Sequence, residues 1–141
     1  MSQVRKERVD ISPEDFETVV EACQDAGVQA KIITAQESRF GRSYGKTESG
    51  QVVQITGHGI ETWGQPVVEV VPNRNGEGVE FVVDLHSNRA ANDKKFQGLK
   101  SQIHAHYQKH KAIKAAKKMG FTVASTQDEE DKITIKVRKF I

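Results

Sequence analysis

The chain has 141 residues, of which 36% are hydrophobic and 28% charged, a composition that excludes an intrinsically disordered chain and predicts one globular domain over residues 1–141. The formal net charge of +2 favours no class of partner by itself. A single cysteine excludes an intramolecular disulfide, and no apolar run is long enough to cross a bilayer, so we expect a cytoplasmic protein without a membrane partner.

The first part of the chain predicts a strand, a helix and a second strand. A short strand is expected over residues 4–11. Ser12 and Pro13 then have the chemistry of a helix N-cap and a first helical position, and Gly27 supplies the stop before a strand at residues 28–33. The apolar face of this helix, at spacings of three and four, consists of Phe16, Val19, Val20 and Cys23.

The middle of the chain predicts an antiparallel meander. Residues 36–50 are polar and contain three glycines, which indicates a loop. Three strands follow at residues 51–56, 65–71 and 77–85, with turn-forming residues between them. Trp63, in a Gly-rich stretch between the first two of these strands, is expected to plug the core; the alternative is an exposed anchor for a partner.

The last part of the chain predicts a long helix and a closing hairpin. The helix is expected to begin with a cap at Asn92 or Asp93 and to end near Gly120. Residues 121–124 and 133–137 then pair around an acidic turn. The apolar stripe of the long helix consists of Phe96, Leu99, Ile103, Tyr107 and Ile113.

These elements follow the order β-α-β-β-β-β-α-β-β, without an internal linker or a clear repeat. The predicted fold class is therefore α+β, with a mainly antiparallel sheet and two helices on one face. The opening β-α-β and the closing α-β favour a ferredoxin-like layout with extra strands.

Charge is distributed unevenly between the two predicted helices. Residues 12–27 carry five acidic side chains and no Lys or Arg, whereas residues 91–120 carry eight lysines against one aspartate. Opposite charges of this kind could attract a partner protein or a second copy of the chain, which leaves a homo-oligomer open. The lysine-rich helix could also follow a phosphate backbone, although a solvated face is the simpler interpretation.

A second basic segment, residues 39–46, lies in the predicted loop. It resembles a phosphate-binding P-loop, but only three residues separate Gly41 from Gly45 where the motif has four, and a strand follows instead of a helix. We therefore expect no nucleotide site there. The candidate surface for a protein partner or a nucleic acid draws on both basic segments: Lys109, Lys111, Lys114, Lys117, Lys118, Arg39, Arg42, Tyr44 and Lys46.

Side chains suited to catalysis or metal binding are few. Cys23 lies on the apolar face of the first helix, where it is expected to be a small buried hydrophobe. Asp84 and His86 are a candidate acid–base pair, although an outward aspartate beside a loop histidine is the simpler interpretation. His106 and His110 share a helix face, but no acidic residue close in the sequence completes a zinc site. We predict a non-enzyme without cofactor or metal, and the histidine pair stays open.

Several short motifs occur together at the end of the first helix and in the closing third. They are Ala26-Gly27-Val28, Gly98-Leu99, Tyr107, the lysine-rich helix end, Gly120-Phe121-Thr122-Val123 and the strand at residues 133–138. On these residues the chain resembles a small domain-of-unknown-function family found in cyanobacteria, as a conserved reading frame in some plastid genomes, and in some phages. The centre of the chain, residues 36–75, departs from that family, which usually has an Arg-Gly-Tyr stretch there.

The resemblance supplies no catalytic residues. Genes of this family often lie near an AAA-type ATPase, which implies a helper or adaptor role. We therefore predict a non-enzymatic protein-interaction or adaptor module that serves an AAA-type ATPase machine or acts as a phage accessory protein. The alternative is a nucleic-acid-binding module that uses the lysine-rich helix.

Overall fold

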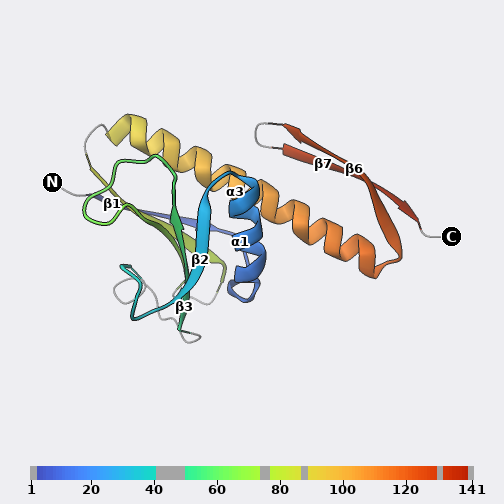
Figure 1. Ribbon diagram of the computed structural model, residues 1–141, viewed down its shortest axis with the longest axis horizontal. Helices are drawn as coiled ribbons and strands as arrows, with labels where there is room; N and C mark the ends of the chain where they lie inside the picture. Colours follow the sequence, from blue (N-terminus) through green and yellow to red (C-terminus); the bar gives the residue numbers. More distant parts are fainter. Residues whose placement is uncertain (1–2, 41–49, 74–76, 87–88, 130–131, 140–141) are drawn as a thin grey trace.

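The computed structural model describes residues 3–40, 50–73, 77–86, 89–129 and 132–139 (Figure 1). Its helices and strands follow one another in the predicted order and confirm the α+β class. Two helices lie on one face of an antiparallel five-stranded sheet, and a separate hairpin closes the chain. The elements are β1 (Gln3–Val9), η1 (Pro13–Asp15), α1 (Phe16–Asp25), β2 (Gln29–Thr34), β3 (Gln51–Thr56), β4 (Val68–Pro72), β5 (Val79–Leu85), α3 (Arg89–Lys118), β6 (Phe121–Glu129) and β7 (Lys132–Lys139).

The five-stranded sheet has the order β1-β5-β4-β3-β2, and every pair of neighbours is antiparallel. Strands β3, β4 and β5 form the predicted meander, and β2 extends it at one side. Because β5 pairs with β1, the first strand occupies one edge of the sheet and β2 occupies the other.

The ferredoxin-like layout expected from the sequence is wrong in its topology. That layout places the first strand inside the sheet, whereas β1 is an edge strand and β6 and β7 form a sheet of their own. Helix length explains the difference. The 30-residue α3 spans roughly 45 Å at 1.5 Å per residue, about twice the length of the seven-residue β5, so the chain has passed the sheet before the hairpin begins.

The main core lies between the sheet and the two helices. Alternate residues of β3, β4 and β5 face the helices and are fully buried, as the period of two in a strand requires. Ile113, the last residue of the predicted stripe, is only partly buried and does not join this core. The stripe residues that join this core are Phe96, Leu99, Ile103 and Tyr107.

The sequence predicts the end of α1 correctly, but its start differs: Ser12 caps the short 3-10 turn η1, and α1 begins at Phe16. The hydroxyl oxygen of Ser12 accepts a hydrogen bond from the amide of Glu14 at 3.3 Å, and Pro13 opens the short 3-10 turn η1 before the helix. Gly27, with a φ of 82°, follows the helix in the left-handed conformation that glycine adopts without strain. The chain then enters β2. α1 itself packs against α3.

The opposite face of the sheet carries a smaller apolar cluster that includes Phe40. Beside it, Glu69 of β4 is fully buried. Its carboxylate accepts hydrogen bonds from the Ser38 hydroxyl at 2.7 Å and from the amides of Arg39 and Phe40 at 3.1 and 2.7 Å. A buried carboxylate needs such partners, so Glu69 fixes the place where the segment after β2 crosses the sheet.

Two local predictions are corrected. α3 begins at Arg89 rather than at a cap formed by Asn92 or Asp93. Asn92 is 2% exposed, and its side-chain oxygen accepts a hydrogen bond from the amide of Glu61 at 3.2 Å, so it joins the helix to a loop instead of capping it. Trp63 does not plug the core, because it is 37% exposed.

Candidate functional site

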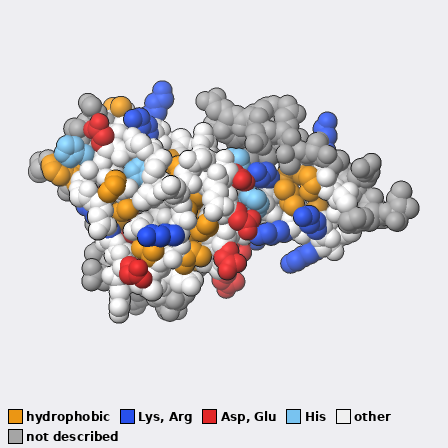
Figure 2. Space-filling model, in the orientation of Figure 1, with side chains coloured by type: hydrophobic (Ala, Val, Ile, Leu, Met, Phe, Trp, Pro, Cys, Tyr) orange, Lys and Arg blue, Asp and Glu red, His pale blue; other side chains and the backbone are white. Residues whose placement is uncertain are grey.

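The lysine-rich half of α3 lies alongside the acidic helix α1. The Nζ of Lys109 is 2.8 Å from Oδ2 of Asp25, and the Nζ of Lys111 is 3.0 Å from Oδ2 of Asp15. Figure 2 shows acidic and basic side chains meeting along this boundary. The opposite charges of the two helices are therefore matched, in large part, within the molecule.

A third lysine, Lys114, continues the same set of contacts. Its ammonium donates to the hydroxyl of Thr18 at 2.8 Å and lies 4.0 Å from Glu21. One turn before Lys111, the hydroxyl of Tyr107 donates to Asp15 at 2.6 Å. We call these contacts the interhelical ladder; its members are Asp15, Thr18, Glu21 and Asp25 on one side and Tyr107, Lys109, His110, Lys111 and Lys114 of α3 on the other.

The ladder shifts the acidity of its two aspartates. The hydrogen bond from Tyr107 holds the pKa of Asp15 below its ordinary value, although burial opposes this. At Asp25 burial raises the pKa, but hydrogen bonds from Lys109 and His110 outweigh burial, and the pKa is lowered. The side chains that join the two helices thus also stabilise both carboxylates in their charged form.

The histidine pair left open by the sequence lies against this ladder. His110 is placed between two carboxylates, with its Nε2 2.7 Å from Asp25 and its Nδ1 3.4 Å from Glu21, and His106 lies 3.9 Å from Asp25. α1 thus supplies the acidic groups that the sequence near the histidines lacks. The ammonium of Lys109 already lies between Asp25, at 2.8 Å, and His106, at 3.4 Å. Among the residues described, no three His, Cys, Asp or Glu side chains are arranged to hold a metal ion.

Beyond the ladder, the last turn of α3 is open to solvent. Lys117, Lys118 and Met119 are exposed, Met119 by 71%. Within the described part of the chain, neither lysine has an acidic partner. Gly120, with a φ of 86°, then turns the chain toward the hairpin. No described helix, α3 included, combines the length and the apolarity that crossing a membrane requires.

The hairpin of β6 and β7 packs on the end of α3 and runs back beside it (Figure 1). Its strands pair antiparallel from Phe121 with Lys139 to Glu129 with Lys132. In the ranges that the structure describes, each of these strands has one strand neighbour, so each presents an edge without a strand partner. We call the end of α3, residues 108–118, together with this hairpin the C-terminal arm.

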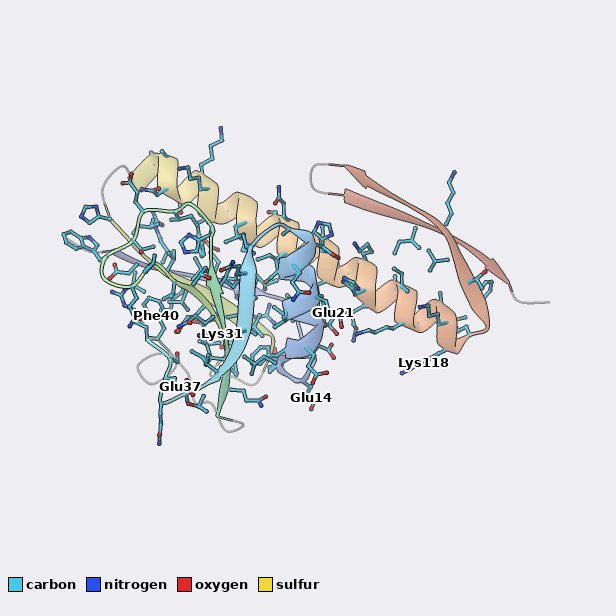
Figure 3. The ribbon with its side chains drawn as sticks, viewed as in Figure 1. Glu14, Glu21, Lys31, Glu37, Phe40 and Lys118 are labelled. Carbon is cyan, nitrogen blue, oxygen red and sulfur yellow. The ribbon has the colours of Figure 1, made fainter. Side chains whose placement is uncertain are left out.

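The two basic segments of the predicted surface are not brought together. Figure 3 shows Phe40, the residue after Arg39, and Lys118 at opposite ends of the molecule. The helical lysines and Arg39 thus belong to different parts of the surface. Three further residues of the predicted surface lie outside the described residues: Arg42, Tyr44 and Lys46.

Arg39 and Asp84 instead hold the loop to the sheet. The Nη2 of Arg39 is 3.0 Å from Oδ2 of Asp84, and its Nη1 donates to the main-chain oxygens of Trp63 and Gln65. Asp84 is 5% exposed, so water screens this ion pair little. The Asp84 carboxylate is therefore engaged with Arg39, while the ring of His86 packs edge-on against Trp63, with 4.0 Å between ring centroids.

Cys23 is enclosed in the main core. Its side chain is fully buried, as its place on the apolar helix face predicts, and burial raises the pKa of the thiol to about 12. A thiol with such a pKa stays protonated at neutral pH, and the thiolate is the reactive form. The buried position therefore suits packing rather than nucleophilic chemistry.

Comparisons with known proteins do not assign a family. No protein-family model matches the chain, and no curated protein or solved structure matches it significantly. The resemblance based on the first helix and the closing third therefore stays a prediction. Function is inferred from the ladder and from the C-terminal arm.

Proposed function

We propose that this protein is a non-enzymatic protein-interaction module that docks a partner protein on its C-terminal arm. The observation that carries the proposal is a two-stranded sheet outside the main sheet, held on the projecting end of α3. A two-stranded hairpin is marginally stable by itself. Its edges offer main-chain donors and acceptors to an extended segment of a partner, and a third strand would stabilise the arm.

Side chains at the end of α3 indicate the chemistry of the partner. Lys117 and Lys118 add positive charge that the ladder does not neutralise, and Met119 adds exposed apolar surface. A partner segment that carries carboxylates beside apolar side chains would complement this surface, since opposite charge steers the encounter and the flexible methionine adapts to the contact.

An adaptor is the role that such an arm would serve. The main core gives the arm a fixed base, because α3 runs continuously from one to the other. The family resemblance implies an AAA-type ATPase machine as the class of partner, and a phage accessory protein as a second setting. Both uses need a folded body with a docking surface, and neither needs a catalytic residue.

A nucleic-acid-binding module is the alternative, and the ladder weakens it. Each phosphate that a protein neutralises adds affinity by releasing counterions. Three of the five helical lysines already contact side chains of η1 and α1, which leaves Lys117 and Lys118 as the exposed charges of the last turn. Two lysines would give weak binding that disappears at moderate salt.

Two charge-reversal variants of α3, one in the arm and one outside it as a control, test the docking role. The full chain, Lys118→Glu and the control Lys94→Glu would each be used to capture partners from cells that express the protein, with recovery measured by quantitative mass spectrometry. Lys94 is an exposed lysine near the start of α3, outside the arm. Recovery of the true partner should fall about tenfold with Lys118→Glu, in line with a charged contact of about 1.5–3 kcal/mol, and stay unchanged with Lys94→Glu.

Two results would contradict the docking role. One is that every captured protein is recovered equally with both variants. The other comes from fluorescence anisotropy with mixed-sequence RNA and single-stranded DNA across salt. Tight binding that falls steeply with salt and is lost in Lys118→Glu would favour the nucleic-acid alternative.

A further inference from the structure

The main core is incompletely covered on the side where α1 and β2 lie. Among the described residues, the partly buried apolar side chains that pack against this core are Val20 of α1, Ala26 after it, Val28 before β2 and Ala30 within β2. Ile32 lies on the same face of β2 as Ala30 and is 36% exposed. Figure 2 shows hydrophobic side chains at the surface between β2 and α1. We call these five residues the edge strip.

The edge strip follows a strand whose outer side is open. In the described ranges β2 pairs with β3 alone. In an antiparallel pair, every second residue exchanges main-chain hydrogen bonds with the neighbouring strand, and the residues between them point their N–H and C=O groups away from it. The amide of Ala35 donates to the carbonyl oxygen of Gly50 at 2.7 Å, in the register that pairs β2 with β3. Counted back from Ala35 in this alternation, Ala30 and Ile32 are residues whose main-chain groups point outward.

The opposite edge of the main sheet is protected from strand pairing. Its strand, β1, is charged at every position of residues 5–8. α3 contacts this strand, since the side-chain amide of Gln97 donates to the carboxylate of Glu7 at 2.8 Å. Charged side chains on an edge strand discourage pairing with another chain. β2 carries a single charge, Lys31, whose side chain lies on the face of the strand away from the edge strip. The edge that can accept a further strand is therefore β2.

We propose that β2 pairs antiparallel with β2 of a second copy of the chain, about a two-fold axis at Ile32. At this position the N–H of each Ile32 donates to the C=O of the other, and the two Cα atoms lie about 5.5 Å apart. Ala30 then faces Thr34 of the second copy. The carbonyl oxygen of Thr34 accepts from the amide of Glu37 at 3.1 Å, so the chain turns there and the pairing uses residues 30–34 of each copy.

The surface around this axis is complementary to itself. The edge strip contains no charged residue, so the strips of two copies can meet without like charges within them. Lys31 falls opposite Ile33 of the second copy rather than opposite another Lys31, which avoids the repulsion of like charges in direct register. Pairing would join the two five-stranded sheets into one and cover the open side of both cores. The contact involves no residue of the C-terminal arm, so it does not depend on the docking role.

Charged substitutions at the axis test the pairing by analytical ultracentrifugation of the full chain. The wild type should sediment as a reversible dimer. Ile32→Lys and Ile32→Glu should each weaken dimerisation about tenfold or more, because each places two like charges opposite one another and removes an apolar contact. An equimolar mixture of the two variants should dimerise again, since Lys then faces Glu. The matched control is Met119→Lys, which changes another exposed apolar residue and should dimerise like the wild type.

Amide hydrogen exchange of the wild type tests the register without a substitution. The amides of Ala30 and Ile32 point outward, so they should be protected at concentrations where the dimer forms and should exchange faster when the sample is diluted. The amide of Ile33 bonds to β3 in either state and should stay protected. The expected result is therefore a concentration dependence that alternates along β2.

Several results would overturn the proposal. A wild type that stays monomeric at its highest soluble concentration would exclude the dimer, and protection that requires another protein would assign β2 to a different occupant. A dimer weakened equally by Met119→Lys would place the contact on the arm, and a mixture of the two Ile32 variants that stays monomeric would exclude the axis at Ile32.

Ile32→Pro gives a second reading if the charged variants perturb the fold. Proline removes an N–H that points outward, so the hydrogen bonds between β2 and β3 are kept and the dimer should still be weakened. Circular dichroism checks that each variant is folded. The capture experiment with Lys118→Glu uses a different surface, so the dimer and the docking role fail separately.

Discussion

The two halves of α3 belong to one continuous helix but are stabilised in different ways. The first half, up to Tyr107, buries side chains such as Phe96 and Ile103 completely against the sheet. The second half, residues 108–118, contains no fully buried residue. It is held instead by the interhelical ladder to α1 and by the hairpin that packs on it.

The difference between the two halves is one of energy. Burying a large apolar side chain contributes about 1.5–3 kcal/mol, whereas a partly exposed ion pair contributes about 0–1 kcal/mol. The first half therefore anchors the helix in the fold. The second half can exchange its contacts for those of a partner with little loss of stability, which suits a docking surface.

Truncation of a buried aromatic ring in the first half of α3 should cause the largest decrease in the free energy of unfolding. Phe96→Ala removes a fully buried side chain from the main core and should lower the free energy of unfolding by about 3–5 kcal/mol. Ile113→Ala, in the second half, removes a partly buried side chain and should cost about 1 kcal/mol or less. Urea unfolding followed by circular dichroism measures both. Equal losses would show that the second half is as firmly anchored as the first.

Neutralising one carboxylate of the interhelical ladder should lower the free energy of unfolding by an intermediate amount. Asp15→Asn weakens the hydrogen bond from Tyr107 and removes the ion pair with Lys111. The free energy of unfolding at neutral pH should fall by about 1–2 kcal/mol, because hydrogen bonds to charged groups contribute about 1.5–3 kcal/mol and this carboxylate is partly exposed. Glu14→Gln is the control: it removes a neighbouring exposed acid outside the ladder and should cost at most about 0.5 kcal/mol.

Lowering the pH should remove the stabilisation that the ladder carboxylates contribute. The pKa values of Asp15 and Asp25 are depressed in the folded protein. Their contribution is therefore complete above the pKa of the unfolded chain, near about 4, and is lost as the pH falls through the lower folded-state pKa. The free energy of unfolding should fall below about pH 4, and less steeply in Asp15→Asn. An unchanged slope in that variant would mean that carboxylates outside the ladder control acid unfolding.

The main core can be predicted from the sequence because burial follows local periodicity. Helical spacing from Phe16 predicts the face of α1 that the structure buries. The start of α3 and the order of the sheet are not predicted, since they depend on long-range effects. One is the hydrogen bond between Asn92 and Glu61, and another is the length of α3 relative to the strands.

The candidate site is predicted less well because its contacts join distant parts of the chain. The charges of both helices are evident in the sequence, yet Asp15 and Lys111 are separated by 96 positions, and no local pattern indicates that they meet. Glu69 does leave a signal, since it interrupts an otherwise apolar strand. A charge in such a place predicts a buried carboxylate with dedicated donors.

Adding a methyl group to Gly98, in the first half of α3, and to Gly120, just after its second half, should change the free energy of unfolding least, with opposite signs. Gly98 has ordinary helical geometry and open space around it, so Gly98→Ala should raise the free energy of unfolding by about 0.5–1 kcal/mol. Gly120 also has open space, but its φ of 86° is strained for alanine, so Gly120→Ala should destabilise the arm by about 1 kcal/mol. Amide hydrogen exchange should then become roughly fivefold faster in β6 and β7 and stay unchanged in the main sheet. An equal change in the main sheet would show that arm and core open as one unit, and the distinction between the two halves of α3 would be lost.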